Sequence, residues 1–291
     1  MTTLTTPQAT DRPGWRARAL FSPMLLWLLV FVVAPTGILL VYSFFQNAGY
    51  SEVEHSFTWG NYSLAFSRVY LRVFARSMVY AGLTTVLCAL IGYPVAYYIG
   101  RSPARSRNRL LMLVMIPFMT SFLIRAVAWT TILDQHGVLN TILRAFHLIP
   151  TLLGQDFEVL RTPAAVLIAL VYTYLPFMIL PIYGSVEKLD ESLLEAASDL
   201  GAGPARAFAR VVLPLTMPGV GAGVLMVFVP AVAMFAVTHV MSGGTIHLIG
   251  DVIQDQFSSS GNLPFGSALG MVLLIGFIAT FFLFTKREKA A

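Results

Sequence analysis

Six stretches of the chain are long and apolar enough to cross a lipid bilayer as helices. A bilayer core is about 30 Å thick, so a spanning helix needs about 20 predominantly apolar residues. Charged residues make up only 11% of the 291 residues and the mean hydropathy is +0.74, so most of the chain is expected to lie in lipid. The predicted spans are Leu20–Phe45, Ser77–Ile99, Leu110–Leu133, Ala164–Tyr183, Val211–Val240 and Gly266–Phe284. We therefore predict an all-α polytopic membrane protein with six transmembrane helices.

The distribution of lysine and arginine predicts which side of the membrane each loop faces, because these residues are enriched in cytoplasmic loops. With the N-terminus inside, thirteen of them fall in inside segments and five in outside segments, which leaves Arg125 within the third span. The loop 101–109 alone carries four arginines and no acid. We therefore predict that both termini are cytoplasmic and that the longer loops 46–76, 134–163 and 241–265 lie outside.

The inside loop between the fourth and fifth spans carries a spaced motif. Glu195-Ala-Ala is followed after three residues by Gly201, and after nine more by Val211-x-Leu-Pro. This pattern resembles the EAA motif (E-A-A-x3-G-x9-[IV]-x-L-P) of permease subunits in binding-protein-dependent ABC importers. The resemblance implies that the loop is a coupling helix that docks on a separate cytoplasmic ATPase. The residues implied in ATPase coupling are Glu195, Ala196, Ala197, Asp199, Gly201, Gly203 and Arg206.

Local signals predict two short helices in this loop. Asp190 or Ser192 can cap the first helix, and Ser192-x-x-Glu195 has capping-box spacing. Gly201 fits the left-handed residue just past a helix end, and Gly203-Pro204 fits the start of a second short helix. The alternative interpretation is an amphipathic helix that lies on the membrane surface.

Several segments narrow the resemblance to the spermidine/putrescine-type permeases, and to the first permease of the pair in such systems. These segments are 117–129 with 137–140, 175–183, 228–235, and parts of 241–268. Relatives with the same framework are thought to carry opines, ferric iron chelates, thiamine or phosphonates, so another cargo is the alternative.

The resemblance implies the type I ABC importer permease fold, in the plasma (inner) membrane of a bacterium. It also implies three kinds of partner besides lipid: a second, related permease in a heterodimer, two cytoplasmic ATPase subunits, and a soluble substrate-binding protein. The predicted segments are a cytoplasmic tail at 1–19, the first transmembrane helix and periplasmic loop at 20–72, the importer transmembrane domain at 73–283, and a cytoplasmic tail at 284–291.

Five residues in the predicted spans are candidates for the translocation pathway. Arg125 is costly in hydrocarbon and is expected to face the bundle, as a cargo contact or as a structural bridge. Trp129 lies one turn later, where it can stack on a cationic cargo or anchor the helix at the interface. Tyr172 is a candidate either for the wall of the pathway or for ordinary packing. Phe228 and Phe235 are seven residues apart, so we expect them to share a face as an apolar gate or as ordinary packing.

No motif indicates catalysis. The chain has no G-x-x-x-x-G-K-[ST] phosphate loop, so ATP hydrolysis is expected in a partner subunit and this chain is not predicted to be an enzyme. No catalytic residue, cofactor, metal site or nucleic-acid partner is predicted. His239 and His247 lack further ligands at metal spacing. A stand-alone secondary transporter would call for inverted repeats and intramembrane carboxylates, and no such repeat is evident in the sequence.

Overall fold

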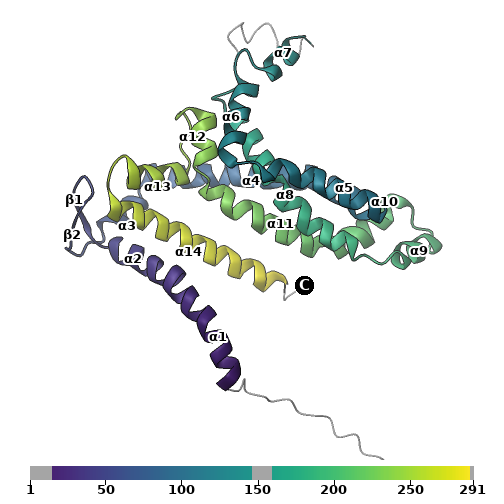
Figure 1. Ribbon diagram of the computed structural model, residues 1–291, viewed down its shortest axis with the longest axis horizontal. Helices are drawn as coiled ribbons and strands as arrows, with labels where there is room; N and C mark the ends of the chain where they lie inside the picture. Colours follow the sequence, from purple (N-terminus) through teal and green to yellow (C-terminus); the bar gives the residue numbers. More distant parts are fainter. Residues whose placement is uncertain (1–14, 146–158, 289–291) are drawn as a thin grey trace, which may run out of the picture.

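The computed structural model describes residues 15–145 and 159–288, and it confirms the predicted all-α class apart from one small hairpin (Figure 1). The predictions for residues 1–14, 146–158 and 289–291 lie outside the described part. The elements are α1 (Trp15–Leu28), η1 (Leu29–Val33), α2 (Ala34–Tyr42), β1 (Gln46–Gly49), β2 (Glu52–Glu54), α3 (Gly60–Ala65), α4 (Arg68–Arg101), α5 (Ala104–Met115), η2 (Ile116–Met119), α6 (Phe122–Leu133), α7 (Val138–Ala145), α8 (Pro163–Glu187), α9 (Ser192–Asp199), α10 (Pro204–Ala207), η4 (Phe208–Val212), α11 (Leu213–Ala233), α12 (Ala236–Ser242), α13 (Ile249–Ser258) and α14 (Leu263–Glu288).

Three long helices, α4, α8 and α11, pack side by side as the core of the molecule (Figure 1). Small residues let two of them approach closely. A Cβ on Gly219 of α11 would overlap the side chain of Ser185 on α8. A Cβ on Gly223 would likewise overlap the sulfur of Met178. In lipid, where burial of apolar surface gives little drive for helix association, such close backbone packing holds helices together.

Five of the predicted spans correspond to a long apolar helix. These helices are Ser22–Tyr42, Arg68–Arg101, Pro163–Glu187, Pro204–Ala233 and Leu263–Phe282. Their lengths and compositions suit a bilayer, although two of them begin or end well away from the predicted boundaries.

The third predicted span, Leu110–Leu133, is wrong as a single straight helix. The segments Ala104–Met119 and Ile124–Ile142 meet at an angle of 92°. Pro117 lies in a short 3₁₀ turn at the bend, where its missing N–H removes a helical hydrogen bond. Thr120 then has extended backbone angles, with ψ of 151°. The second segment, α6 with α7, therefore projects from the core as an arm (Figure 1).

The fifth predicted span, Val211–Val240, also differs from the structure. The helix begins earlier and ends earlier, at Pro204–Ala233. Met234 leaves the helical region with ψ of 122°, and α12 starts two residues later. The first turn of α13 fills the space beyond this helix end, since a Cβ on Gly250 would overlap the carbonyl oxygen of Ala233.

The predicted outside loop 46–76 forms an ordered layer at one end of the core. It contains the antiparallel hairpin β1–β2, the short helix α3 and the first turns of α4. The backbone N–H of Ser51 donates to the carbonyl of Gly261 at 2.9 Å, and the hydroxyl of Tyr50 donates to the carbonyl of Ser258 at 3.1 Å. The hairpin is thus tied to the turn between α13 and α14.

Candidate functional site

The predicted coupling loop contains a short exposed helix, α9, that stands at one end of the molecule (Figure 1). Asp190 lies just before the helix, and one of its carboxylate oxygens accepts a hydrogen bond from the backbone N–H of Ser192, the first residue of α9, at 3.0 Å. This hydrogen bond lowers the pKa of Asp190. The N-cap residue is Glu191 and makes no side-chain cap, so the predicted capping box between Ser192 and Glu195 is wrong. The Asp190 bond satisfies the helix start instead.

The C-terminal end of α9 closes at a left-handed glycine. Gly201 has φ of +77°, and its N–H donates to the carbonyl of Ser198 at 2.9 Å. The N–H of Ala202 donates to the carbonyl of Ala197 at 3.0 Å. A residue with a Cβ is strained at this φ, so the geometry explains the glycine that the motif requires.

The predicted second short helix is wrong as a separate element. Gly203 is the N-cap and Pro204 the first helical residue, as the sequence predicts. The helix then continues without a break through η4 into α11, as far as Ala233. Only the turn 200–203 therefore separates α9 from a helix that continues into the core.

The surface of α9 combines small, apolar and charged groups. Leu200 is 89% exposed and Leu193 is 44% exposed, which is unusual for side chains that a helix could have turned inward. Ala197 is half-buried, and the other predicted coupling residues are exposed: Glu195, Ala196, Asp199, Gly201, Gly203 and Arg206. Such a surface suits close contact with another protein.

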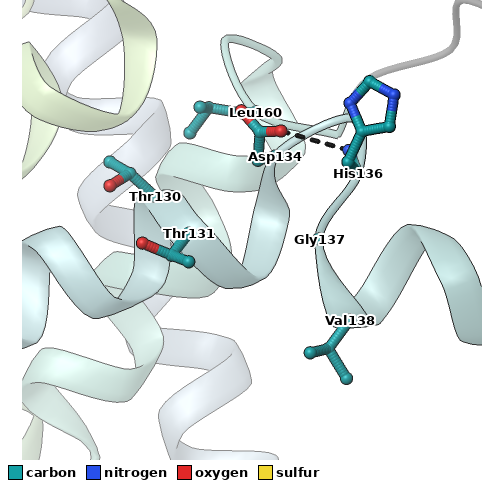
Figure 2. A pocket seen from close by; sticks show the side chains of 7 residues that line it. All are labelled: Thr130, Thr131, Asp134, His136, Gly137, Val138 and Leu160. Carbon is teal, nitrogen blue, oxygen red and sulfur yellow. Dashed lines mark hydrogen bonds between the residues drawn. The ribbon is translucent and has the colours of Figure 1, made fainter.

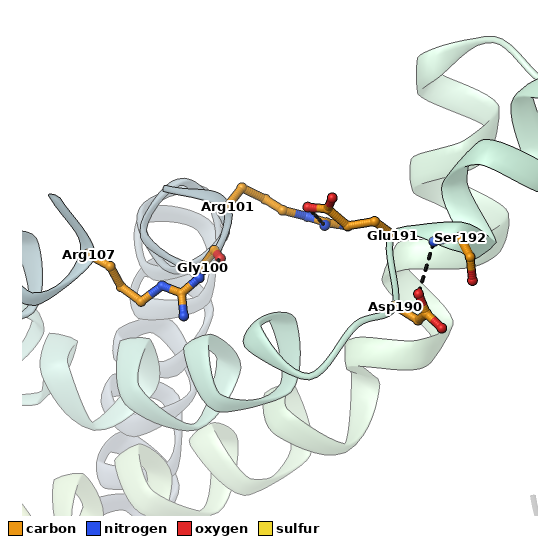
Figure 3. Close-up of polar contacts among 6 residues, drawn as sticks. All are labelled: Gly100, Arg101, Arg107, Asp190, Glu191 and Ser192. Atoms are coloured by element: carbon orange, nitrogen blue, oxygen red, sulfur yellow. Dashed lines mark hydrogen bonds and ion pairs between the residues drawn. The ribbon is translucent and has the colours of Figure 1, made fainter. Parts of the chain in front are cut away.

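Two ion pairs join the end of α4 and the start of α5 to the end of α8 and the N-cap of α9. A guanidinium nitrogen of Arg101 lies 3.3 Å from a carboxylate oxygen of Glu191 (Figure 3). A guanidinium nitrogen of Arg107 lies 2.6 Å from a carboxylate oxygen of Glu187. Arg107 also donates to the carbonyl of Gly100 at 3.3 Å. We call these two pairs the charge clamp. These four residues are not among the predicted site residues, because in the sequence the arginines of residues 101–109 indicate only which side of the membrane this segment faces.

Three of the five predicted pathway residues lie together. Arg125, Trp129 and Tyr172 line a narrow cavity between α6, α8 and α12, and this cavity also has Val237 and Met241 in its wall. The Trp129 and Tyr172 rings meet edge to face, with centroids 5.2 Å apart. The structure therefore joins residues that lie about forty positions apart in the sequence.

The guanidinium of Arg125 lies over an aromatic ring rather than beside an acid. Its Cζ is 4.9 Å from the centroid of Phe118, and Phe118 stacks on Tyr172 at 5.7 Å. Nε and Nη1 are buried and have no hydrogen-bond partner within residues 15–145 and 159–288. Arg125 as a whole is half-buried, but a buried N–H group without an acceptor is costly, so these two atoms call for an acceptor from outside the described residues.

The expectation that Phe228 and Phe235 share a helical face is wrong. The helix ends at Ala233, and Phe235 is the N-cap of α12. Seven-residue spacing places side chains on one face only where the helix is continuous. Phe228 packs on the core, whereas Phe235 is 42% exposed.

Five helices that are long and apolar enough to cross a membrane define the chain as a polytopic helical membrane protein. Residues 90–286 match the family described as "Binding-protein-dependent transport system inner membrane component". The chain belongs to this family, and it is therefore a transport component of the inner membrane.

Two curated relatives narrow the position of the chain within the family. It is 41% identical over 263 residues to the spermidine/putrescine transport system permease protein PotB of Haemophilus influenzae, covering 90% of this chain and 91% of that protein. It is 40% identical over 249 residues to PotB of Escherichia coli, covering 86% and 89%. The predicted resemblance to the spermidine/putrescine-type permeases is confirmed.

The predicted importer fold is confirmed as well. The structure is similar to a chain of a bacterial ABC transporter involved in import of the acidic polysaccharide alginate, with a TM-score of 0.72 and 16% identity. The likeness covers 95% of this chain and 96% of that chain. At this identity it speaks for the fold alone.

Proposed function

We propose that this chain forms half of the translocation pathway of an ABC importer for polyamines such as spermidine and putrescine. The observation that carries the cargo assignment is the 41% identity to a spermidine/putrescine permease over 90% of this chain. Identity at this level over nearly the whole of both chains supports a cargo of the same class.

The proposed partners are a second, related permease, two cytoplasmic ATPase subunits and a soluble substrate-binding protein. The docking element for the ATPase is α9, with the seven predicted coupling residues. Their exposure and the apolar Leu200 support this role. Both termini would be cytoplasmic, which places α9 and the charge clamp inside. The importer domain would span 73–283, between a first helix with its periplasmic loop and the two tails.

The proposed pathway runs past the cavity of Arg125, Trp129 and Tyr172. Aromatic faces bind organic cations, so Trp129 and Tyr172 suit the ammonium groups of a polyamine. No carboxylate lines this cavity among the described residues. The acids that a polyamine also needs would then come mainly from the partner permease. Phe228 and Phe235 remain proposed wall residues at two separate positions.

One observation favours a second candidate, the same importer with an anionic cargo. The buried Nε and Nη1 of Arg125 lack acceptors among the described residues, and a cargo carboxylate would supply them. The two candidates make opposite predictions about cargo charge.

Vesicles that hold the whole complex, with its own binding protein, test both candidates. The proposal predicts ATP-dependent uptake of radiolabelled putrescine or spermidine, and none with a complex whose ATPase is inactivated. Uptake of an anionic or neutral cargo without any polyamine uptake would overturn the cargo assignment and keep the importer function.

A further inference from the structure

A second, larger pocket lies at the far end of the α6 helix from Arg125 (Figure 2). Its volume is about 450 Å³. The last turn of α6, the turn that follows it and the first residue of α7 form its walls, and Leu160 closes one side. The pocket is large enough for a small organic molecule and is open to the outside of the molecule.

Most polar groups of this pocket are hydrogen-bond acceptors and Asp134 supplies a negative charge, while the His136 side chain, which also lines the pocket, can donate as well as accept. Asp134 carries a full charge where α6, a helix of 12 residues, ends with the negative pole of its dipole. The carbonyl oxygens of Thr131 and Ile132 face the same turn, since a Cβ on Gly137 would overlap both. The side-chain hydroxyls of Thr130 and Thr131 already donate to the carbonyl of Val127, so toward a ligand they can only accept.

Asp134 has one hydrogen-bond partner for its side chain among the described residues. One of its carboxylate oxygens accepts from the backbone N–H of His136 at 3.1 Å. Both salt bridges found in the described residues lie at the charge clamp, so no lysine or arginine there pairs with Asp134. Figure 2 shows the carboxyl group of Asp134 at the His136 side of the pocket.

The lining selects a class of ligand. A divalent metal calls for several oxygen or nitrogen ligands, and the described residues contain no group of three His, Cys, Asp or Glu that could hold one. An alkylammonium group fits better, because it donates hydrogen bonds to a carboxylate and to hydroxyl oxygens. Its methylene chain can pack on Val138 and Leu160, which form the apolar walls.

The pocket lies beyond the aromatic cavity along α6, toward the C-terminal end of that helix. Thr130 lines the pocket and its neighbour Trp129 lines the cavity. Asp134 and Arg125 are nine residues apart, or about 14 Å along a helix. A cation moving along α6 would thus meet a carboxylate first, aromatic rings next and a guanidinium last.

We propose that the pocket around Asp134 is a binding site for a primary ammonium group, which receives the cargo before it reaches the aromatic cavity. The site deepens the proposed function and rests on it for the identity of the cargo. Its chemistry does not depend on that function, because the carboxylate, the helix end and the apolar walls bind any primary alkylamine.

The test compares Asp134→Asn with Glu52→Gln in the whole complex. The asparagine keeps an acceptor for the His136 N–H but loses the charge, and Glu52 is an exposed acid on the hairpin, far along the chain from α6. In vesicles, Asp134→Asn should raise the putrescine concentration for half-maximal uptake about three- to tenfold, and 0.5 M salt should shrink this difference. Asp134→Glu should restore most of the loss. Equal values for Asp134→Asn and Glu52→Gln would overturn the site.

A binding measurement separates failure of the site from failure of the function. Equilibrium binding of radiolabelled putrescine to the purified complex in nanodiscs, without binding protein or ATP, reports the site directly. Weaker binding by Asp134→Asn supports the site even if the vesicles import no polyamine. Binding that is identical in the two variants overturns it even if they do.

Discussion

The two ends of the described core differ in whether their charged side chains lie beside an opposite charge. At the coupling end, Arg101 and Arg107 form ion pairs with Glu191 and Glu187, just before α9. In the other half, Arg125 and Asp251 form no ion pair within the described residues, and Arg125 lies over the ring of Phe118. Both regions keep buried side-chain atoms that have no hydrogen-bond partner there, so ion pairing is what distinguishes them. An ion pair ties two elements of one chain together, whereas a charge without an opposite charge beside it is available to another molecule.

Replacing Gly201 should have the largest effect on uptake, because Gly201 ends α9, the proposed docking helix. Gly201 has φ of +77°, where a β-branched residue costs about 1–3 kcal/mol. Gly201→Val should abolish ATP-dependent uptake in vesicles while membrane insertion stays nearly intact. Glu195→Lys, which reverses an exposed charge on the docking surface, should do the same.

Gly221→Ala is the control for the glycine. Gly221 lies within α11, does not have a positive φ, and an added Cβ would meet nothing within 4 Å, so uptake should stay within about twofold of the parent. Normal uptake by both Gly201→Val and Glu195→Lys, at normal abundance, would contradict the docking role.

Reversing one side of the charge clamp should have the next largest effect. Arg107→Glu places two acids in contact, because Arg107 lies 2.6 Å from Glu187. We expect uptake to fall about tenfold, and the double variant Arg107→Glu with Glu187→Arg to recover most of it. Partly exposed ion pairs contribute only about 0–1 kcal/mol to stability, so abundance should change little.

The control for the clamp is Arg105→Glu, the same charge change at an exposed position of the same loop. It should leave uptake nearly unchanged. A double variant no better than Arg107→Glu alone would show that the pair does not transmit motion between the two loops.

The coupling end could be predicted in detail because its signals are local. The EAA spacing, the position of Gly201 and the Gly203-Pro204 start are all read within twenty residues, and the structure has the glycine turn and the helix start in those places. The clamp could not be predicted, because it joins residues about eighty positions apart. Only the fold brings those two loops together.

The other half is harder to predict from the sequence, because hydropathy shows how long an apolar segment is but not whether its helix is straight. An apolar run that spans Pro117 has the same mean hydropathy whether the helix continues or bends by 92°. The end of α11 at Ala233 depends on the packing of α13 against it, which is a tertiary effect. Arg125 and Trp129 could be predicted as candidates from their residue types. The rings that surround them, Phe118 and Tyr172, lie outside α6, so only the fold brings them together.

Removing Trp129 should have a moderate effect, in the half where Arg125 forms no ion pair within the described residues. Each cation–aromatic contact contributes about 0.5–2 kcal/mol, so Trp129→Ala should weaken polyamine uptake about three- to tenfold. Trp129→Phe should lose less, since it keeps an aromatic face beside Tyr172. Association with the ATPase, measured by co-purification, should not change. Trp59→Ala, at a 63% exposed tryptophan, is the control, and an equal loss in both would refute the cargo contact.

The smallest effect concerns Asp251, the buried carboxylate beside the break after α11. Its side chain accepts from the N–H of Leu248 at 2.9 Å, and its other oxygen has no partner in the described part of the chain. Burial raises the pKa of Asp251 from 3.8 to about 6, while the Leu248 hydrogen bond and the nearby histidines 239 and 247 oppose this shift and Asp255 adds to it. The folded state therefore holds the proton more tightly than the unfolded state.

It follows that stability should fall as the pH rises from about 4 to about 6, and should stay lower above that. Asp251→Asn removes the charge and keeps the acceptor for the Leu248 N–H. At pH 7.5 we expect the variant to raise the Tm of the purified complex by a few degrees, and at pH 4.5 to leave it unchanged. Asp255→Asn, one turn along α13, should show no such dependence on pH. A lower Tm for Asp251→Asn at pH 7.5 would contradict this prediction. It would mean that the ionised carboxylate of Asp251 has a partner outside the described residues, as we infer for the guanidinium of Arg125.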